Sequence, residues 1–158
     1  MTSADSRPGR EEEERTVAQV LEVLPGLVRL LSGATAAPGS SGERLHLTQF
    51  RILRHLGEGR LLGSELAARL DLTAPAVSVA VEGLVRHGLV DRHRAEDGDR
   101  RAVPLTITEA GRQALAAARQ RQQGALADLL HGLTPLERSH LAAGIEGLVR
   151  AQQQRRAR

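Results

Sequence analysis

The sequence predicts a mainly helical protein that carries one small β-hairpin. Of its 158 residues, 41% are apolar and Phe50 is the only aromatic, so the core has to be built from Leu, Val and Ala, which favours packed helices. Apolar side chains recur at helical spacing along most of the chain. The exception is residues 89–107, where two runs with strand character, 89–94 and 102–107, flank a charged turn around Gly98.

Composition limits the classes of function. The chain has no Cys, which excludes disulfides, thiolate redox sensing and Cys-ligated zinc. The formal net charge of +3 is modest, so only a clustered basic patch would indicate nucleic-acid binding. Every basic residue is Arg, which suits forked contacts to phosphate. No uninterrupted apolar run approaches the roughly 20 residues of a membrane span, and no signal peptide is recognisable, so we expect a cytoplasmic protein without a membrane partner.

The N-terminal part is expected to contain a short tail, a helical region and a loop. Residues 1–10 are predicted to be a disordered tail. The acidic run 11–14 suits a helix N-terminus, and an apolar stripe follows from Val17 to Leu31. Pro25-Gly26 interrupts this stripe and predicts either a kinked helix or two pieces. Residues 32–43 have the composition of a flexible loop.

Three shorter helices are expected between residues 48 and 87. The first begins near Thr48, an N-cap candidate, and ends at Gly57 and Gly59. The second covers residues 63–70. After a tight turn the third has Thr73 as its N-cap and Pro75 in its first turn, and Gly88 closes it. The expected core positions of these helices are Phe50, Leu53, Leu56, Leu66, Ala67, Leu70, Val77, Val81 and Leu84.

Two longer helices are expected after the hairpin. Thr108-Glu109 opens the first, which runs to about residue 130 and includes a polar, solvated section between Leu115 and Leu126. Thr134 and Glu137 form a capping box at the start of the second. The last residues, 152–158, are expected to be frayed.

Residues 63–90, GSELAARLDLTAPAVSVAVEGLVRHGLV, have the order of a helix-turn-helix, in which the second helix enters a major groove of DNA. An ordinary helical hairpin would give the same pattern, and a hairpin rich in Arg is by itself compatible with a solvated surface. Because the β-hairpin follows the second helix directly, the two features together favour a winged helix-turn-helix, whose wing carries Arg into a minor groove. The candidate DNA contacts are Thr73, Ala74, Ala76, Ser78, Val79, Glu82 and Arg86 on the helix, and Arg92, Arg94, Asp99, Arg100 and Arg101 in the wing.

The apolar stripes at 17–31 and 126–149 exceed what a small winged helix needs to cover itself. Left unpaired they would form a sizeable exposed patch, so we expect a second copy of the chain to cover them. The alternative is that they pack on each other within one subunit.

The chain resembles the MarR-type transcriptional regulators. The matching stretches are LHLTQFRILRHL (45–56), SELAARLDLTAPAVS (64–78), LVRHGLVDRHRAEDGDRRAVPLTITEAG (84–111) and LTPLERSHLAAGIEGL (133–148). The resemblance implies a homodimer whose first and last helices interlock, with two winged helices spaced for a palindromic DNA site. It assigns residues 11–31 and 108–154 to dimerisation and 45–107 to the DNA-binding lobe. It also implies a ligand cleft between the two, and therefore a ligand-responsive regulator, most simply a repressor.

Two departures from the family pattern bear on DNA reading. Such recognition helices often carry Arg just after the Ser and again four residues later, where this chain has Val79 and Gly83. In the wing, Gly98 stands where the first of two Arg would be, so Arg101 inherits the minor-groove role with Asp99 as its orienting partner. We therefore expect modest specificity, with thymine-methyl contacts from Ala and Val and a hydroxyl from Ser78. The alternative is a nonspecific DNA-coating or protein-interaction dimer that has lost operator reading.

The effector is hardly legible in the sequence. The resemblance implies a small lipophilic acid, and Arg51, Arg54 and His55 are candidate ligand residues, although a solvated helix face explains each as well. A zinc site at Glu43, His46 and His55 is a weaker alternative, since no His-x3-His pair exists. We predict no metal and no cofactor. No G-x-S-x-G, P-loop or dinucleotide-binding motif is present, so an enzyme is not expected.

Overall fold

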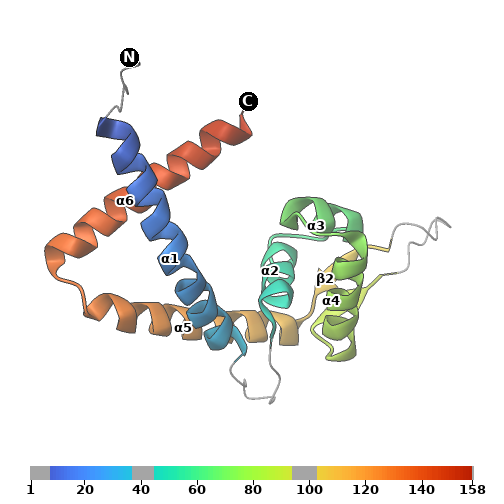
Figure 1. Ribbon diagram of the computed structural model, residues 1–158. Coiled ribbons are helices and arrows are strands. Elements are labelled where there is room, and N and C mark those ends of the chain that lie inside the picture. Colours follow the sequence, from blue (N-terminus) through green and yellow to red (C-terminus); the bar gives the residue numbers. More distant parts are fainter. Residues whose placement is uncertain (1–7, 37–44, 94–102, 158) are drawn as a thin grey trace. The chain divides into compact units, whose positions relative to one another are not determined.

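The structure is a computed structural model that describes residues 8–36, 45–93 and 103–157 (Figure 1). Within these ranges the elements are α1 (Pro8–Ala36), α2 (Leu47–Leu56), α3 (Gly63–Leu70), α4 (Ala74–Arg86), β1 (Val90–Arg92), β2 (Leu105–Ile107), α5 (Glu109–His131) and α6 (Pro135–Arg156). The predicted class, mainly helical with a small β-wing, is confirmed. The chain forms two compact units, residues 1–122 and 123–158, and the boundary falls inside α5.

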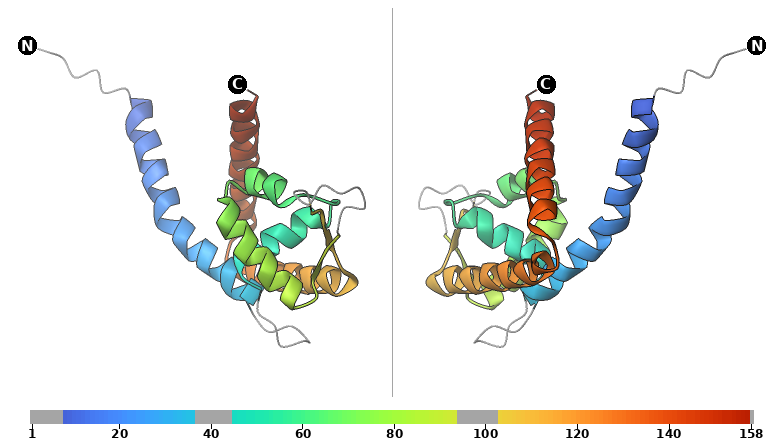
Figure 2. Two further views of the ribbon diagram at one scale, coloured as in Figure 1. Left: turned by 90° about the vertical axis from the view of Figure 1, so that its right-hand side faces the viewer. Right: turned by 90° about the vertical axis from the view of Figure 1, so that its left-hand side faces the viewer.

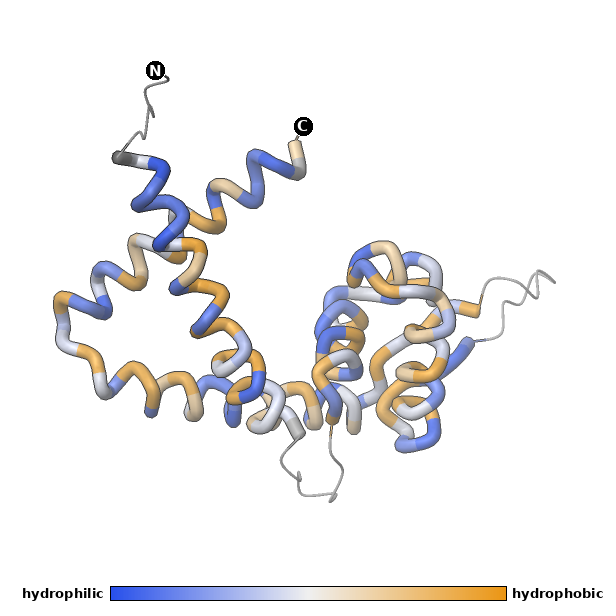
Figure 3. The backbone as a smooth tube through the Cα atoms, in the orientation of Figure 1, coloured by the Kyte–Doolittle hydropathy of each residue, from blue (hydrophilic) through white to orange (hydrophobic). Residues whose placement is uncertain are grey.

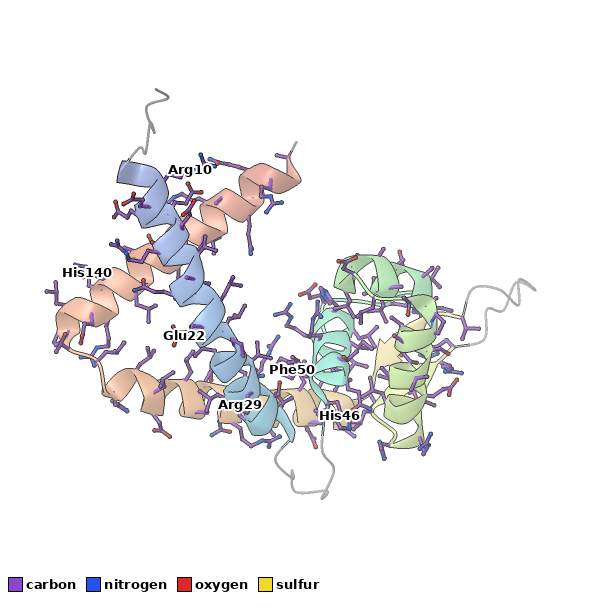
Figure 4. The ribbon with its side chains drawn as sticks, in the orientation of Figure 1. Arg10, Glu22, Arg29, His46, Phe50 and His140 are labelled. Carbon is purple, nitrogen blue, oxygen red and sulfur yellow. The ribbon has the colours of Figure 1, made fainter. Side chains whose placement is uncertain are left out.

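The hydrophobic core lies in the first unit and is almost wholly aliphatic. Eight of the nine core positions expected in the three short helices are buried, and Ala67 is half-buried against them. Phe50, one turn after His46 on α2, supplies the single aromatic ring (Figure 4). Ile52 is also fully buried, although it was not among the expected core positions. The other buried apolar residues are Leu45, Leu61, Leu89, Val90, Leu105, Leu115 and Ala118.

Helix α1 is a single helix of 29 residues, and it curves along its length (Figure 2). It begins at Pro8 and includes Pro25, so both the expected tail up to residue 10 and the two-piece alternative are wrong at this point. Proline removes one backbone hydrogen bond and strains the preceding turn, which a long helix accommodates by bending. Residues 32–36 are helical rather than part of the expected loop, and residues 37–44 lie outside the described residues.

By length and composition, α1 is apolar enough over Gly9–Thr35 to cross a membrane, which differs from the expectation drawn from uninterrupted apolar runs. Hydrophobic and polar positions alternate along it (Figure 3), and the charged side chains of Glu22 and Arg29 extend from it (Figure 4). None of the apolar window is buried. The helix is therefore an amphipathic element whose apolar side chains are exposed in the single chain.

The three short helices begin and end where local chemistry places them. Helix α2 starts one residue earlier than expected, because the N–H of His46 donates to Oε1 of Gln49 at 3.0 Å, so the expected cap at Thr48 is wrong. Helix α3 has the expected bounds. The hydroxyl of Thr73 accepts a hydrogen bond from the N–H of Ala76 at 3.4 Å, which confirms the expected cap of α4. Gly88, at φ 68°, closes α4 as expected.

The wing is a two-stranded antiparallel sheet in which Val90 lies opposite Ile107. Both strands are shorter than the predicted runs, and residues 94–102 lie outside the described part of the chain. Leu61 adds a one-residue bridge to Leu105, with N–H···O distances of 3.2 and 2.8 Å. This bridge connects the segment before α3 to the base of the wing.

Helix α5 follows the wing through Thr108, whose hydroxyl donates to the carbonyl of Gly88 at 2.7 Å and accepts from the N–H of Gly111 at 3.0 Å. The section after Leu115 was expected to be solvated, but part of it packs against other residues. Ala118 is fully buried, and the half-buried side chains of Arg121 and Gln122 bind the end of α1.

In the second unit, the capping box at the start of α6 is confirmed. The N–H of Glu137 donates to Oγ1 of Thr134 at 3.3 Å, and the N–H of Thr134 donates to Oε2 of Glu137 at 2.8 Å. The helix continues to Arg156, so the expected fraying from residue 152 is wrong.

Candidate DNA-binding surface

Helix α4 has one face buried in the core and leaves the other exposed, as a recognition helix requires. Val77, Val81 and Leu84 anchor one face in the core. The positions that the sequence assigned to DNA are all exposed: Thr73, Ala74, Ala76, Ser78, Val79, Glu82 and Arg86. At 3.6 residues per turn, Val79, Glu82 and Arg86 form one stripe along the outermost line of the helix.

Apart from Arg86, the outer face of α4 has no long hydrogen-bond donor. Val79 is 70% exposed at the position where the family often has Arg. The hydroxyl of the preceding residue, Ser78, donates to Oε1 of Glu82, one turn later in the helix, at 3.4 Å. The helix therefore presents an apolar surface, a carboxylate oriented by a hydroxyl, and a guanidinium in its last turn.

The packing of α4 against α2 explains the glycine at position 83, which the sequence alone did not indicate. It is half-buried, and a Cβ at this position would lie 2.7 Å from Nε2 of Gln49 on α2. Gln49 is not free to move without loss, because its Oε1 accepts the N–H of His46. Gly83 thus allows α2 and α4 to approach each other closely.

The wing lies beside α4 and encloses a hollow of about 380 Å³ with it. Arg92, on β1, lines this hollow together with Ser64 at the start of α3 and Ser78 on α4. On the wing itself, His93 Nε2 lies 2.6 Å from Oγ1 of Thr106 on the facing strand. The sequence analysis did not select His93, although its place next to the strand could have indicated it. The other wing candidates, Arg94, Asp99, Arg100 and Arg101, lie outside the described residues.

A helix-turn-helix with its outer face exposed, followed at once by a two-stranded wing, is the arrangement seen in winged-helix DNA-binding proteins. The sequence profile of the MarR family matches residues 45–102, which span this arrangement from before α2 into the wing. The matched segment therefore has the sequence pattern of the MarR family.

Solved structures extend the likeness beyond the matched segment. The transcriptional regulator BldR from Sulfolobus solfataricus is 25% identical, with a TM-score of 0.67 over 89% of this chain and 96% of BldR. RV1404 from Mycobacterium tuberculosis is 21% identical, with a TM-score of 0.73 over 96% of this chain and 97% of the other. Wild-type MarR from E. coli, in its apo form, is 21% identical, with a TM-score of 0.68 over 83% and 94%. No curated protein sequence matches the chain. The chain has the fold of MarR-family transcriptional regulators, and its structural neighbours are regulators rather than enzymes.

The three ligand candidates do not form one site. Nη2 of Arg51 donates to the carbonyl of Leu70 at 3.1 Å, so this side chain caps the end of α3. Nδ1 of His55 lies 3.6 Å from Oε2 of Glu58 and has no hydrogen-bond partner among the described residues. Within the described ranges no group of three or more metal-ligating side chains forms, and Glu43 of the zinc alternative lies outside them.

Arg54 alone faces a second hollow, of about 360 Å³, between α2 and α5. Arg112 and Arg119 on α5 line it too, with Leu115 and Ala116 as its apolar part. The lining also contains one acidic side chain, that of Glu58. The guanidinium of Arg112 already has a partner, because its Nε donates to Oε2 of Glu109 at 2.9 Å. This hydrogen bond lowers the pKa of Glu109. The sequence analysis found Arg54 but missed both α5 arginines, since residues so distant in sequence give no local signal.

Proposed function

We propose that the chain is a ligand-responsive repressor that binds a palindromic DNA operator as a homodimer. The observation that carries this proposal is the exposed outer face of α4 beside the wing, on a helix whose other face is fixed in the core. A rigid support of this kind allows a helix to enter the major groove while the wing reaches the neighbouring minor groove. A cytoplasmic location belongs to the same proposal.

The homodimer is supported by apolar side chains that the single chain leaves uncovered. On α1, Leu21 is 63% exposed, and on α6, Leu148 is 61% exposed. The remaining uncovered positions on these helices and at the end of α5 are Val17, Val20, Val23, Leu24, Val28, Leu126, Leu129, Leu136, Leu141, Ile145 and Val149. Soluble proteins rarely leave so many large apolar side chains in water. A second copy of the chain would cover them and would set two recognition helices at a fixed spacing.

A lipid bilayer is the other environment that could cover α1. Glu22 and Arg29 lie within the stretch that would have to cross it, and a charged residue at the centre of a membrane span costs about 2.5–3.5 kcal/mol on insertion scales. In an interface between two chains, the same residues can remain at a solvated rim. The charge pattern therefore favours a protein partner.

The chemistry of α4 supports modest base specificity. Val79 and Ala76 can contact thymine methyl groups, and Ser78 can donate to or accept from a base edge. Arg92 and the wing residues Arg94, Arg100 and Arg101 supply charge for phosphates and for the minor groove, and Asp99 belongs to the same proposed wing contacts. Electrostatic contacts would then dominate affinity and make it strongly dependent on salt.

The effector of the proposed repressor is a small lipophilic anion. The hollow between α2 and α5 supports this class, because the guanidinium groups of Arg54 and Arg119 have no hydrogen-bond or ion-pair partner among the described residues. Leu115 and Ala116 provide apolar contact beside them. An acid with an apolar body would satisfy both parts of this lining.

Selection of bound duplexes from a random pool, followed by anisotropy at two salt concentrations, tests the proposed function. We expect an enriched palindrome, a preference of about 10³-fold or more over random DNA, and weaker binding by Arg101→Ala. A chain that binds every duplex equally would contradict the repressor proposal and would support the DNA-coating alternative. Retention of no DNA at all would support a dimer that acts through protein contacts.

A further inference from the structure

We propose that Glu82 determines specificity by accepting a hydrogen bond from a cytosine amino group, so that each half-site of the operator contains a cytosine at one fixed position. This inference rests on the proposed function, because it requires α4 to lie in the major groove. It adds a base identity, which neither the fold nor the family match supplies.

The position of Glu82 leaves its carboxylate few favourable partners on DNA. It is exposed on the outermost stripe of α4, between Val79 and Arg86, and opposite the residues that anchor the helix. Phosphate oxygens would repel it, and an ionised carboxylate can only accept hydrogen bonds. The donors that the edges of base pairs offer in the major groove are the amino groups of cytosine and adenine. A helix seated in that groove therefore brings Glu82 to one of these groups, pairs it with Arg86 one turn along, or leaves its charge uncompensated. A pairing with Arg86 alone would leave every base position indifferent to Glu82→Gln, so the selection experiment distinguishes it from base reading.

The geometry of α4 prepares the carboxylate for this contact. The hydroxyl of Ser78, one turn earlier, donates to Oε1 of Glu82 at 3.4 Å. At this length the hydrogen bond is weak, so it favours one orientation of the carboxylate without fixing it. Oε2 has no hydrogen-bond or ion-pair partner among the described residues. Restricting the side chain in advance reduces the conformational entropy that binding would otherwise cost.

Cytosine is favoured over adenine because of the neighbouring atoms. The adenine amino group lies between two acceptors, N7 of the same base and O4 of the paired thymine. The cytosine amino group has an acceptor on one side only, O6 of the paired guanine. A carboxylate approaching adenine therefore meets electrostatic repulsion from both sides, and one approaching cytosine from one side. Glutamine reverses this preference, because its amide can pair with N6 and N7 of adenine together.

The test is duplex selection with the wild-type chain, with Glu82→Gln and with Glu13→Gln, which makes the same change of charge at an exposed position near the start of α1. We expect the wild type to enrich a cytosine at one position of each half-site, and Glu82→Gln to replace it with adenine. By anisotropy, changing that cytosine to thymine should weaken wild-type binding by roughly 5- to 100-fold and weaken Glu82→Gln binding much less. Glu13→Gln should behave as the wild type does.

The outcomes separate this inference from the function on which it rests. If wild type and Glu82→Gln enrich the same palindrome with the same base preference at every position, Glu82 does not read a base and only this inference is overturned. If the wild type enriches no palindrome, the repressor proposal fails and the inference fails with it. Circular dichroism of both variants checks that the fold is retained.

Discussion

The side-chain amide of Gln122 donates a hydrogen bond to the hydroxyl of Thr35, with 2.8 Å between Nε2 and Oγ1. Thr35 is fully buried, and its hydroxyl donates in turn to the carbonyl of Leu31 at 2.6 Å. Beside it, Nε of Arg121 donates to the carbonyl of Ala34 at 3.0 Å. Carbonyls in the last turn of a helix have no partner within the helix, so α5 satisfies the end of α1 through side chains.

Breaking this contact should loosen α1 from α5. We expect Thr35→Val and Gln122→Leu each to lower the free energy of unfolding by about 1–2 kcal/mol, because each leaves a polar atom without its partner in a poorly hydrated place. The double variant should lose less than the sum of the two. Urea unfolding of the four proteins measures this coupling. Gln123→Leu, at the exposed next position, is the matched control and should change stability little. Strict additivity of the two changes would show that the hydrogen bond carries no coupling energy.

Gly111 lies close against the backbone of Leu89 at the joint between the wing and α5. A Cβ at this position would collide with the carbonyl oxygen of Leu89 and lie 2.8 Å from Cγ1 of Ile107. We expect Gly111→Ala to lower the free energy of unfolding by about 1–3 kcal/mol through overpacking. Gly124→Ala, in the same helix with nothing within 4 Å, should instead stabilise by about 0.5–1 kcal/mol. Thermal unfolding compares the two, and equal effects would refute the steric explanation.

The DNA-binding lobe is the part of the fold that the sequence predicts best, for two physical reasons. Burial follows the 3.6-residue period of α3 and α4, so Leu66, Leu70, Val77, Val81 and Leu84 were found from spacing alone. Turn chemistry is also local, and Thr73 and Gly88 act at the ends of α4 as their residue types predict.

The parts that sequence reasoning missed depend on contacts between distant segments. An Ala-, Gln- and Arg-rich stretch has the same composition whether it is solvated or, as at Gln122, bound to another helix. Gly83 was interpreted as a missing base contact because its neighbour Gln49 lies 34 positions earlier in the chain. The bridge from Leu61 involves one residue and has no periodicity to detect. Pro25 predicted an interruption that a long helix absorbs.

Arg51 and Arg54 should respond differently to substitution, although the sequence suggested one role for both. Arg51 caps α3, so Arg51→Met should lower the free energy of unfolding by about 0.5–1.5 kcal/mol. Arg54→Met should leave stability nearly unchanged, because this residue is exposed at the rim of the hollow. Under the proposed effector site, Arg54→Met should instead weaken the release of DNA by small aromatic or aliphatic acids. Anisotropy titrations with a panel of such acids measure that release, and an unchanged response would remove Arg54 from the effector site.

The capping box of α6 predicts a pH dependence that can be assigned to one residue. Hydrogen bonds from the backbone N–H and the side chain of Thr134 lower the pKa of Glu137. Because the folded pKa is the lower one, the ionised cap stabilises the protein at neutral pH. That contribution is lost as the pH falls below the usual glutamate value of about 4.3 and through the folded pKa. Thermal midpoints measured from pH 7 to pH 3 should fall less for Glu137→Gln than for the wild type. Glu22→Gln is the control, because it removes a carboxylate that caps no helix. If the thermal midpoint of Glu22→Gln fell with pH as little as that of Glu137→Gln, the assignment to Glu137 would be contradicted.

The exposed apolar face of α1 should control assembly. Leu21→Arg places a charge among apolar side chains that the proposed second copy would cover, whereas Gln19→Arg adds the same charge at an already polar, exposed position. We expect Leu21→Arg to shift sedimentation equilibrium from dimer to monomer and to reduce affinity for the palindrome by at least tenfold, because each half-site alone then has to hold the protein. Gln19→Arg should remain a dimer that binds as the wild type does. A wild-type monomer in solution that pellets with phospholipid vesicles, and loses this binding on Leu21→Arg, would show instead that a bilayer covers α1.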